Sequence, residues 1–197
     1  MKKIFYFLFF LFITSNALAE KLYLKDIKLN EKLTDYLSTE EISNFNINGT
    51  GELKDAYSYD GKYSIINVFF DDQIFFDDYD YIQIVYSNKD NKIKFISAAL
   101  DYRFDNTSGK KQCLNYRDKR ISEYNKEKLL FEFKKNYTNY TYPDGVKEDR
   151  VEFTNPIKRS SFSFYCLYYE NNDNDFRFDY IDTNFWKWYS KQWEKTY

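Results

Sequence analysis

The sequence predicts an α+β domain: an antiparallel, aromatic-rich sheet with a short N-terminal helix, a disulfide-tethered helix over about 110–124 and a C-terminal helix. Apolar residues alternate with period two over 81–104 and 162–180, which predicts two β-hairpins. Tyr, Phe and Trp make up 22% of the chain, and these residue types favour strands and large buried contacts. Helices packed against a face of an antiparallel sheet give the α+β arrangement.

The N-terminal part of the chain is predicted to be helical. Four apolar residues recur at the spacing of one helix face and predict a short helix over about 30–38: Leu29, Leu33, Tyr36 and Leu37. Ser38 and Glu41 form a capping-box pattern that starts a further turn. The stretch 47–51 (Ile-Asn-Gly-Thr-Gly) predicts a turn or linker. The dense apolar stretch 63–70 then predicts a strand.

The middle of the chain is predicted to change from strand to helix and back. Within the hairpin 81–104, a drift in the alternation over 97–100 predicts a bulge. One apolar helix face predicts the helix over about 110–124: Cys113, Arg117, Ile121 and Tyr124. Renewed alternation predicts a strand at 129–133.

The C-terminal part contains a strong turn, three strands and a helix. Tyr142–Gly145 (Tyr-Pro-Asp-Gly) predicts a turn, and Val151 begins the strand after it. The hairpin 162–180 follows. Aromatic residues of 185–193 then recur at helical spacing behind a cap residue, Asp182 or Thr183.

Residues 1–19 have the three parts of a cleavable secretory signal peptide. Lys2 and Lys3 supply the positive start, an apolar run follows to Ile13, and Ala17–Ala19 supplies the small-residue exit. The apolar run is shorter than the roughly 20 residues with which a helix spans a bilayer. We therefore expect export to the periplasm or the exterior of a bacterium. The mature part is expected to be one domain over 20–197 without a transmembrane span.

The two cysteines, Cys113 and Cys166, both lie in the part expected to be exported. An even number of cysteines in an oxidising compartment indicates disulfide bonding, so we expect these two to pair. The alternative is two separate buried thiols. The bond would tie the helix over 110–124 to the sheet that it covers.

Composition excludes several classes of function. The chain lacks His, which removes the usual general base near neutral pH and the commonest zinc ligand. A disulfide would also remove thiol nucleophiles. The 29 basic residues less Lys2 and Lys3 leave 27, against 31 acidic ones, so the mature net charge is −4. A mildly acidic chain with dispersed basic residues has no general attraction to nucleic acid.

An acidic cluster after the strand 63–70 is the candidate metal site. The segment 69–80 repeats Phe-Phe-Asp-Asp and contains five carboxylates: Asp71, Asp72, Asp77, Asp78 and Asp80. Calcium takes several oxygen ligands, and the calcium outside a cell permits a weak site. The alternative is a solvated loop in which the Phe pairs are buried and the Asp side chains face water.

Other carboxylates suggest weaker alternatives. The acidic pattern over 171–182 resembles the ligand spacing of an EF-hand loop, but Phe176 stands where that loop needs Gly, so a hairpin turn is expected. Paired carboxylates also hydrolyse glycosidic bonds. The candidate pairs are those of 71–80 and the pair Glu148 and Asp149.

Aromatic residues at the C-terminus are the candidate contact surface. Exposed Trp or Tyr rings stack on sugars, whereas the alternative is that Trp186, Trp188 and Trp193 pack the last helix onto the sheet. Only one face of that helix is needed to pack against the sheet, so the opposite face stays in contact with solvent. We expect Trp186 and Tyr197 to stay partly exposed as a contact for a protein or a membrane interface.

Because His-based catalysis, thiol nucleophiles and nucleic-acid binding are excluded, the sequence favours a non-enzymatic binding or protein-interaction module of the bacterial envelope. Its partner would be a protein or a glycan. The alternative is a hydrolase or lyase that acts on a polysaccharide through carboxylates and Tyr, with calcium as a structural ion. A cleft in which two carboxylates converge would favour the enzyme. A contiguous exposed aromatic patch would favour the binding module.

We predict that the full chain, expressed in a bacterium with a secretory pathway, is cleaved after Ala19. The small residues at positions 17 and 19 provide the cleavage site. N-terminal sequencing of the exported protein should therefore start at Glu20. A protein that retains Met1 and stays with the membrane would contradict the prediction.

Overall fold

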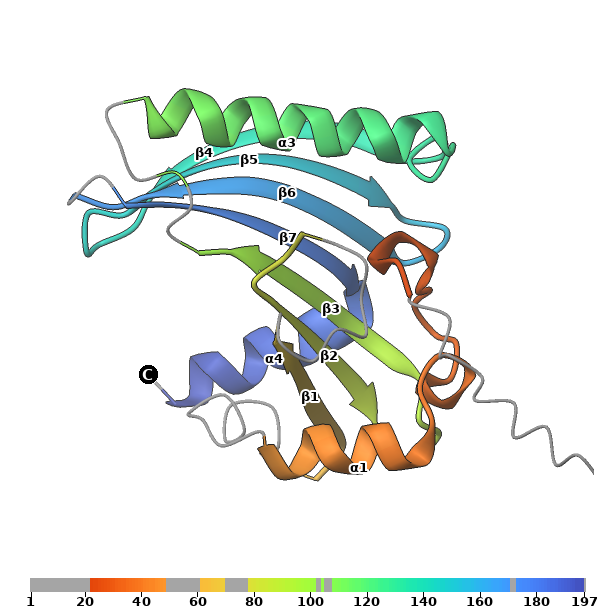
Figure 1. The fold of residues 1–197 in the computed structure, drawn as a ribbon. Helices are drawn as coiled ribbons and strands as arrows, with labels where there is room; N and C mark the ends of the chain where they lie inside the picture. Colours follow the sequence, from red (N-terminus) through yellow and green to blue (C-terminus); the bar gives the residue numbers. More distant parts are fainter. Residues whose placement is uncertain are drawn as a thin grey trace, which may run out of the picture.

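The described part of the chain forms one curved antiparallel sheet with three α-helices (Figure 1). The computed structural model describes residues 22–48, 61–69, 78–101, 104, 108–170 and 173–196. The α+β class expected from the sequence is confirmed. The leader 1–19 and residues 49–51 of the expected linker lie outside the described residues.

The elements follow the expected order with few exceptions. The strands are β1 (Tyr63–Phe69), β2 (Tyr81–Ser87), β3 (Ile93–Leu100), β4 (Lys134–Thr141), β5 (Lys147–Asn155), β6 (Ser160–Tyr168) and β7 (Asn174–Asp182). The α-helices are α1 (Thr39–Asn48), α3 (Gly109–Lys126) and α4 (Thr183–Thr196), and two short 3₁₀ turns precede them: η1 (Leu24–Asp26) and η2 (Leu33–Asp35). Both predicted hairpins, the Tyr142–Gly145 turn and the helix over 110–124 are confirmed.

The strand order is β1-β2-β3-β7-β6-β5-β4, with every neighbouring pair antiparallel. The first three strands form one meander and the last four form another. The two meanders join where β3 pairs with β7, for example at Ser97 opposite Asp179. This junction places β1 at one edge of the sheet and β4 at the other.

Helices cover the two faces of the sheet unequally. The face that carries Ile96, Phe164 and Phe178 packs against α3 and the N-terminal segments. Tyr124 of α3 contacts the rings of Phe164 and Phe178, with centroids 5.2 and 5.5 Å away. On the opposite face, Phe185 of α4 packs against Val85, Phe95 and Ile181. Both faces of the central strands are therefore buried.

The short N-terminal helix lies later in the chain than predicted, at α1 rather than over 30–38. The backbone of the predicted segment is used to extend the sheet: the Asn30 N–H donates to the Ile93 carbonyl at 2.8 Å, and the Ile93 N–H donates to Glu31 at 2.9 Å. Only the 3₁₀ turn η2 forms there. The predicted capping box does start α1, because Ser38 and Glu41 exchange side-chain bonds with each other's backbone N–H at 3.2 and 2.6 Å.

Two local predictions are wrong. The β2–β3 pairing is regular through Ser97 and Ala99, and the irregularity lies instead between Val85 and Tyr86 of β2. Residues 129–133 form turns rather than a strand. Leu130 is the buried residue of that segment, whereas Phe131 is 84% exposed.

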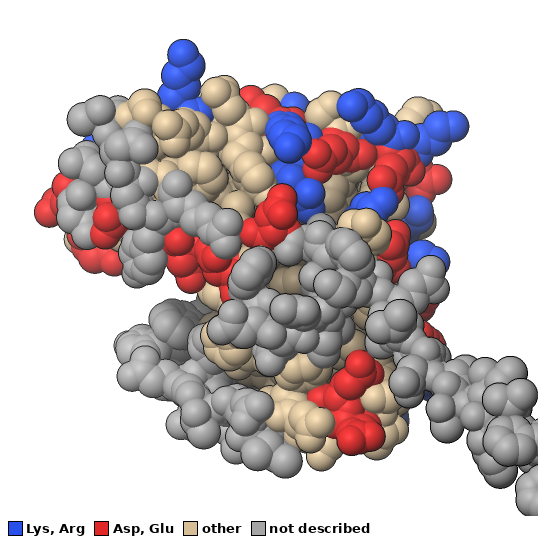
Figure 2. Space-filling view, in the orientation of Figure 1, with Lys and Arg blue, Asp and Glu red and all other residues tan. Residues whose placement is uncertain are grey.

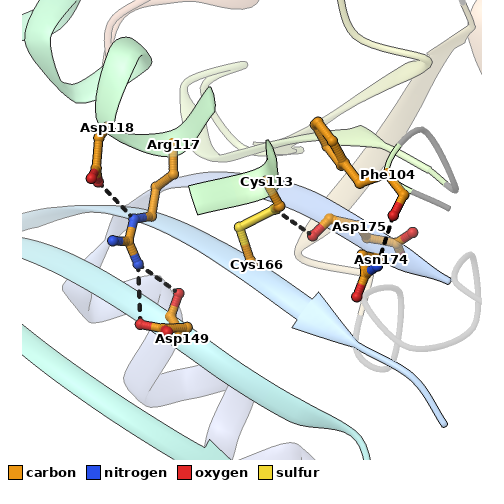
Figure 3. The surroundings of a disulfide bond; sticks show 8 residues. All are labelled: Phe104, Cys113, Arg117, Asp118, Asp149, Cys166, Asn174 and Asp175. Atoms are coloured by element: carbon orange, nitrogen blue, oxygen red, sulfur yellow. Dashed lines mark hydrogen bonds and ion pairs between the residues drawn. A yellow bond between two sulfur atoms is a disulfide. The ribbon is translucent and has the colours of Figure 1, made fainter. Parts of the chain in front are cut away.

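The predicted disulfide joins Cys113 of α3 to Cys166 of β6 (Figure 3). One helical turn further on, Arg117 reaches the carboxylate of Asp149 on β5 at 3.1 Å, and it also pairs with Asp118 at 3.0 Å. A covalent bond and an ion pair thus hold α3 over the second meander. Asp182 caps α4, as expected, by accepting bonds from the N–H groups of Asn184 and Phe185.

We predict that replacing both cysteines by Ser lowers the free energy of unfolding. The bond closes a loop whose ends are 53 residues apart, and closing such a loop contributes about 4 kcal/mol through the entropy of the unfolded chain. Urea unfolding of the oxidised protein and of the double variant measures the difference. A loss below about 1 kcal/mol would show that α3 is held mainly by its packing.

Candidate functional site

The edge strand β4 is the most exposed part of the sheet. It pairs with β5 in continuous register from Lys134 to Thr141. In the described part of the chain, no strand pairs with its other side. Seven of its eight residues are exposed, and Asn136 is intermediate. A strand in this position presents a row of unpaired backbone N–H and C=O groups.

Exposed tyrosines lie on both faces of this edge. Tyr137 is 67% exposed and pairs with Val151, so it lies on the face that carries α3. Tyr140 is 55% exposed and lies on the opposite face, beside its partner Glu148. Its ring contacts that of Tyr142, with the centroids 4.7 Å apart. The edge therefore carries exposed aromatic rings on both faces, with Tyr140 and Tyr142 in contact on one side.

A groove of about 620 Å³ separates β4 from α3. Helix α3 packs mainly over β6 and β7 rather than over β4. Ser122, Asn125 and Lys126 line the groove from the helix, and Lys135 and Tyr137 line it from the strand. The ammonium group of Lys135 lies 4.7 Å from the centre of the Tyr137 ring. The groove thus combines an aromatic ring with hydrogen-bonding and positively charged groups.

A polar cluster lies on the face of the sheet opposite α3, centred on Asp179 of β7. Its carboxylate accepts a hydrogen bond from Ser97 at 2.7 Å and another from Tyr165 at 2.9 Å. The guanidinium of Arg150 stacks over the Tyr165 ring, 4.1 Å from its centre. Asp179 is buried, so these donors replace the water that a carboxylate would otherwise bind.

Two arginines extend the cluster in opposite directions. Arg150 holds Glu148 with two bonds, at 2.6 and 3.0 Å, and Tyr142 also donates to Glu148, at 2.7 Å. The polar cluster thereby reaches the exposed tyrosines of the β4 edge. Arg177 pairs with two carboxylates, those of Asp101 at 2.8 Å and Asp175 at 2.9 Å.

Burial shifts the ionisation of this cluster. It raises the pKa of Asp179 above its usual value, although Arg150, Ser97 and Tyr165 act in the opposite direction. Burial also raises the pKa of Asp101, with further contributions from the neighbouring Asp175 and Asp80. The pKa of Tyr142 rises to about 12 through burial and through its bond to Glu148. Raised carboxylate pKa values are common at functional sites and in structural ion-pair networks alike.

The predicted calcium cluster lies mostly outside the described residues, which exclude Asp71, Asp72 and Asp77. Asp78 is exposed, and Asp80 accepts a hydrogen bond from the Asp101 N–H at 2.8 Å. In the described residues, no group of three or more acidic or Cys side chains is placed to hold a metal ion. The calcium site stays a prediction.

The other candidate carboxylates are held by separate protein groups. Three carboxylates of the EF-hand-like pattern have different partners. Asp175 binds Arg177, and Asp182 binds the start of α4. Asp179 accepts bonds from Ser97 and Tyr165. The pattern belongs to a β-hairpin, as expected. Glu148 and Asp149 lie on opposite faces of β5, where one binds Arg150 and the other binds Arg117.

The expected aromatic contact at the C-terminus is only partly described. Trp186 of α4 is 47% exposed, while Tyr197 lies outside the described residues. Trp188 packs against Tyr63 of β1, with the ring centres 4.6 Å apart. The β4 tyrosines form the more extensive exposed aromatic surface. The strand lacks alternating apolar residues, so the only sequence signal for these tyrosines was the high β-propensity of Tyr.

Comparison of the chain with protein-family models, curated proteins and solved structures finds no match. No helix in the described ranges is long and apolar enough to cross a membrane. Function is therefore inferred from the geometry of the chain itself.

We predict that Asp179→Asn becomes more stable relative to the natural protein as the pH rises above about 4, the pKa of an ordinary Asp. The pKa of Asp179 is raised in the folded state. Its stabilising contribution is therefore complete below the unfolded pKa and is lost as the pH rises through the folded pKa. Asn does not titrate and keeps an acceptor oxygen for Ser97 or Tyr165. Urea unfolding across this pH range measures the difference. A difference that stays constant or reverses would contradict the assignment.

Proposed function

We propose that this chain is an exported, non-enzymatic binding module that takes an extended polypeptide segment of an envelope protein onto the open edge of β4. The observation that carries the proposal is the exposure of β4 along its whole length. Strand addition to a sheet edge is a recurrent mode of peptide recognition, in which the backbone supplies affinity and alternate side chains supply specificity.

The edge has few of the features that normally prevent strand addition. Natural sheets protect an edge with Pro, a bulge, charged side chains or a covering element. Within Lys134–Thr141 the register is unbroken and Pro is absent, and the charges are confined to Lys134 and Lys135. The opposite edge differs, since α1 contacts β1 there (Figure 1). Strand addition is thus favoured at β4.

The tyrosines are suited to hold the added strand. Tyr137 and Tyr140 project to opposite faces, so each would contact side chains on one face of the new strand. Tyrosine contributes a large contact area at a low cost in conformational entropy. Tyr142, fixed by Glu148 at 2.7 Å, supports the ring of Tyr140.

Export is part of the proposal. It is supported by the leader pattern of 1–19 and by the Cys113–Cys166 bond, because disulfides persist mainly in oxidising compartments. An exported location would give β4 access to envelope proteins.

A second candidate function is a carboxylate-based hydrolase or lyase. It is favoured by Asp101 and Asp179, whose raised pKa values lie in one polar cluster. A carboxyl group with a raised pKa keeps its proton to a higher pH than a free carboxyl group, which suits it to act as a general acid. The two functions differ at Asp179: replacement by Asn would abolish hydrolysis and would leave binding at β4 intact.

We predict that a photoreactive phenylalanine analogue at Tyr140 cross-links a partner protein in an envelope extract. The matched control is the same replacement at Phe69, an exposed aromatic residue of the opposite edge strand. Adding Tyr137→Lys should reduce the product formed from position 140 to the control level, because Lys replaces an aromatic contact and protects the edge. Mass spectrometry identifies the product, and thermal melts verify folding.

Equal products from positions 140 and 69 would contradict a binding site at β4. So would a product from position 140 that persists unchanged in the Tyr137→Lys variant.

A further inference from the structure

The end of β4 that begins at Lys134 has an excess of positive charge. Basic and acidic side chains lie side by side over the C-terminal end of α3 (Figure 2). Three glutamates there have partners: Glu123 pairs with Arg120 at 2.9 Å, Glu127 with Lys25 at 2.6 Å, and Glu132 with Lys158 at 2.6 Å. Asp118, which lines the groove, pairs with Arg117, and Arg117 also pairs with Asp149. The charges of the three glutamates are thus already balanced.

Four exposed lysines in the same region form what we call the basic end of β4: Lys126, Lys128, Lys134 and Lys135. None of them forms an ion pair with an acidic side chain in the described part of the chain. Lys126 and Lys135 line the groove between α3 and β4, while Lys134 projects from the opposite face of the strand. The positive charge therefore surrounds the start of the edge.

The other end of the edge has a different character. There the rings of Tyr140 and Tyr142 pack edge to face, and the nearby carboxylate of Glu148 is neutralised by Arg150. An extended segment along β4 would meet aromatic rings at one end and unpaired ammonium groups at the other.

We propose that the segment recognised by β4 carries a pair of acidic residues at its C-terminal end. This inference rests on the proposed function and names the chemistry of the partner. An antiparallel strand places its C-terminal end beside the start of β4, where Lys134 and Lys135 are its cross-strand neighbours. Opposite charges on neighbouring strands stabilise their pairing. Adjacent acidic residues point to opposite faces and would meet one lysine each.

Binding of synthetic peptides to the oxidised mature protein tests the inference. The probe is a peptide of alternating threonine and valine that ends in two glutamates, and its matched controls end in two glutamines or two lysines. The Lys134→Glu, Lys135→Glu double variant should bind the glutamate peptide about tenfold more weakly, which corresponds to about 0.7 kcal/mol for each lysine. The lysine peptide should instead prefer this variant. Lys187→Glu with Lys191→Glu, at exposed positions of α4, is the charge-matched control and should leave both affinities unchanged.

Fluorescence anisotropy gives the affinities, and amide shifts of Lys134–Thr141 show whether the peptide lies at the edge. Equal binding of the glutamate and glutamine peptides, with shifts in β4, would overturn the acidic preference and leave strand addition standing. An equal effect of the α4 control variant would also overturn it. Failure of every peptide to bind would also overturn the acidic preference. The proposed function is tested separately, by cross-linking from position 140.

Discussion

The pairing of β3 with β7 is the constraint on which the rest of the structure depends. It joins two meanders through residues far apart in the chain, such as Ser97 and Asp179, and so it closes a large loop at an entropic cost. Because the last strand of the second meander lies in the middle of the sheet, the first strand of that meander, β4, becomes an outer edge. The exposed edge follows from this topology.

The two faces of the sheet differ in polarity, because successive residues of each strand point to opposite faces. On one face, α3 is bonded through Cys113 and packs over aromatic rings of β6 and β7. On the other, α4 covers the end near Ile181, and the hydrogen-bonded cluster around Asp179 follows along β7. Through Arg150 and Glu148 this cluster reaches Tyr142, which supports the ring of Tyr140. The bonds that hold Tyr142 are made by Glu148 and Arg150 and do not involve Asp179.

The sequence predicts those parts of the fold in which one face is apolar. The helix with Cys113, Arg117 and the following apolar residues is an example, and so are the hairpins. It misses β4, because neither face of that strand is buried and no apolar alternation appears. The sequence predicts the bulge in the wrong place. Strand β3 is buried on both faces, so its apolar residues do not alternate with polar ones. The polar cluster also cannot be predicted from the sequence. Asp179 and Arg150 have the residue types expected at solvent-facing positions, and only the strand order shows that they lie together.

The central claim is that β4 is a formed strand with an unoccupied edge. Amide hydrogen exchange of Lys134–Thr141 in the free protein, followed residue by residue, tests it most directly. Alternate amides, which bond to β5, should be protected, and the intervening ones, which point away from the sheet, should exchange rapidly. Protection of every amide would show an edge already occupied, and rapid exchange of every amide would show that the strand is not formed. Either result would contradict the claim.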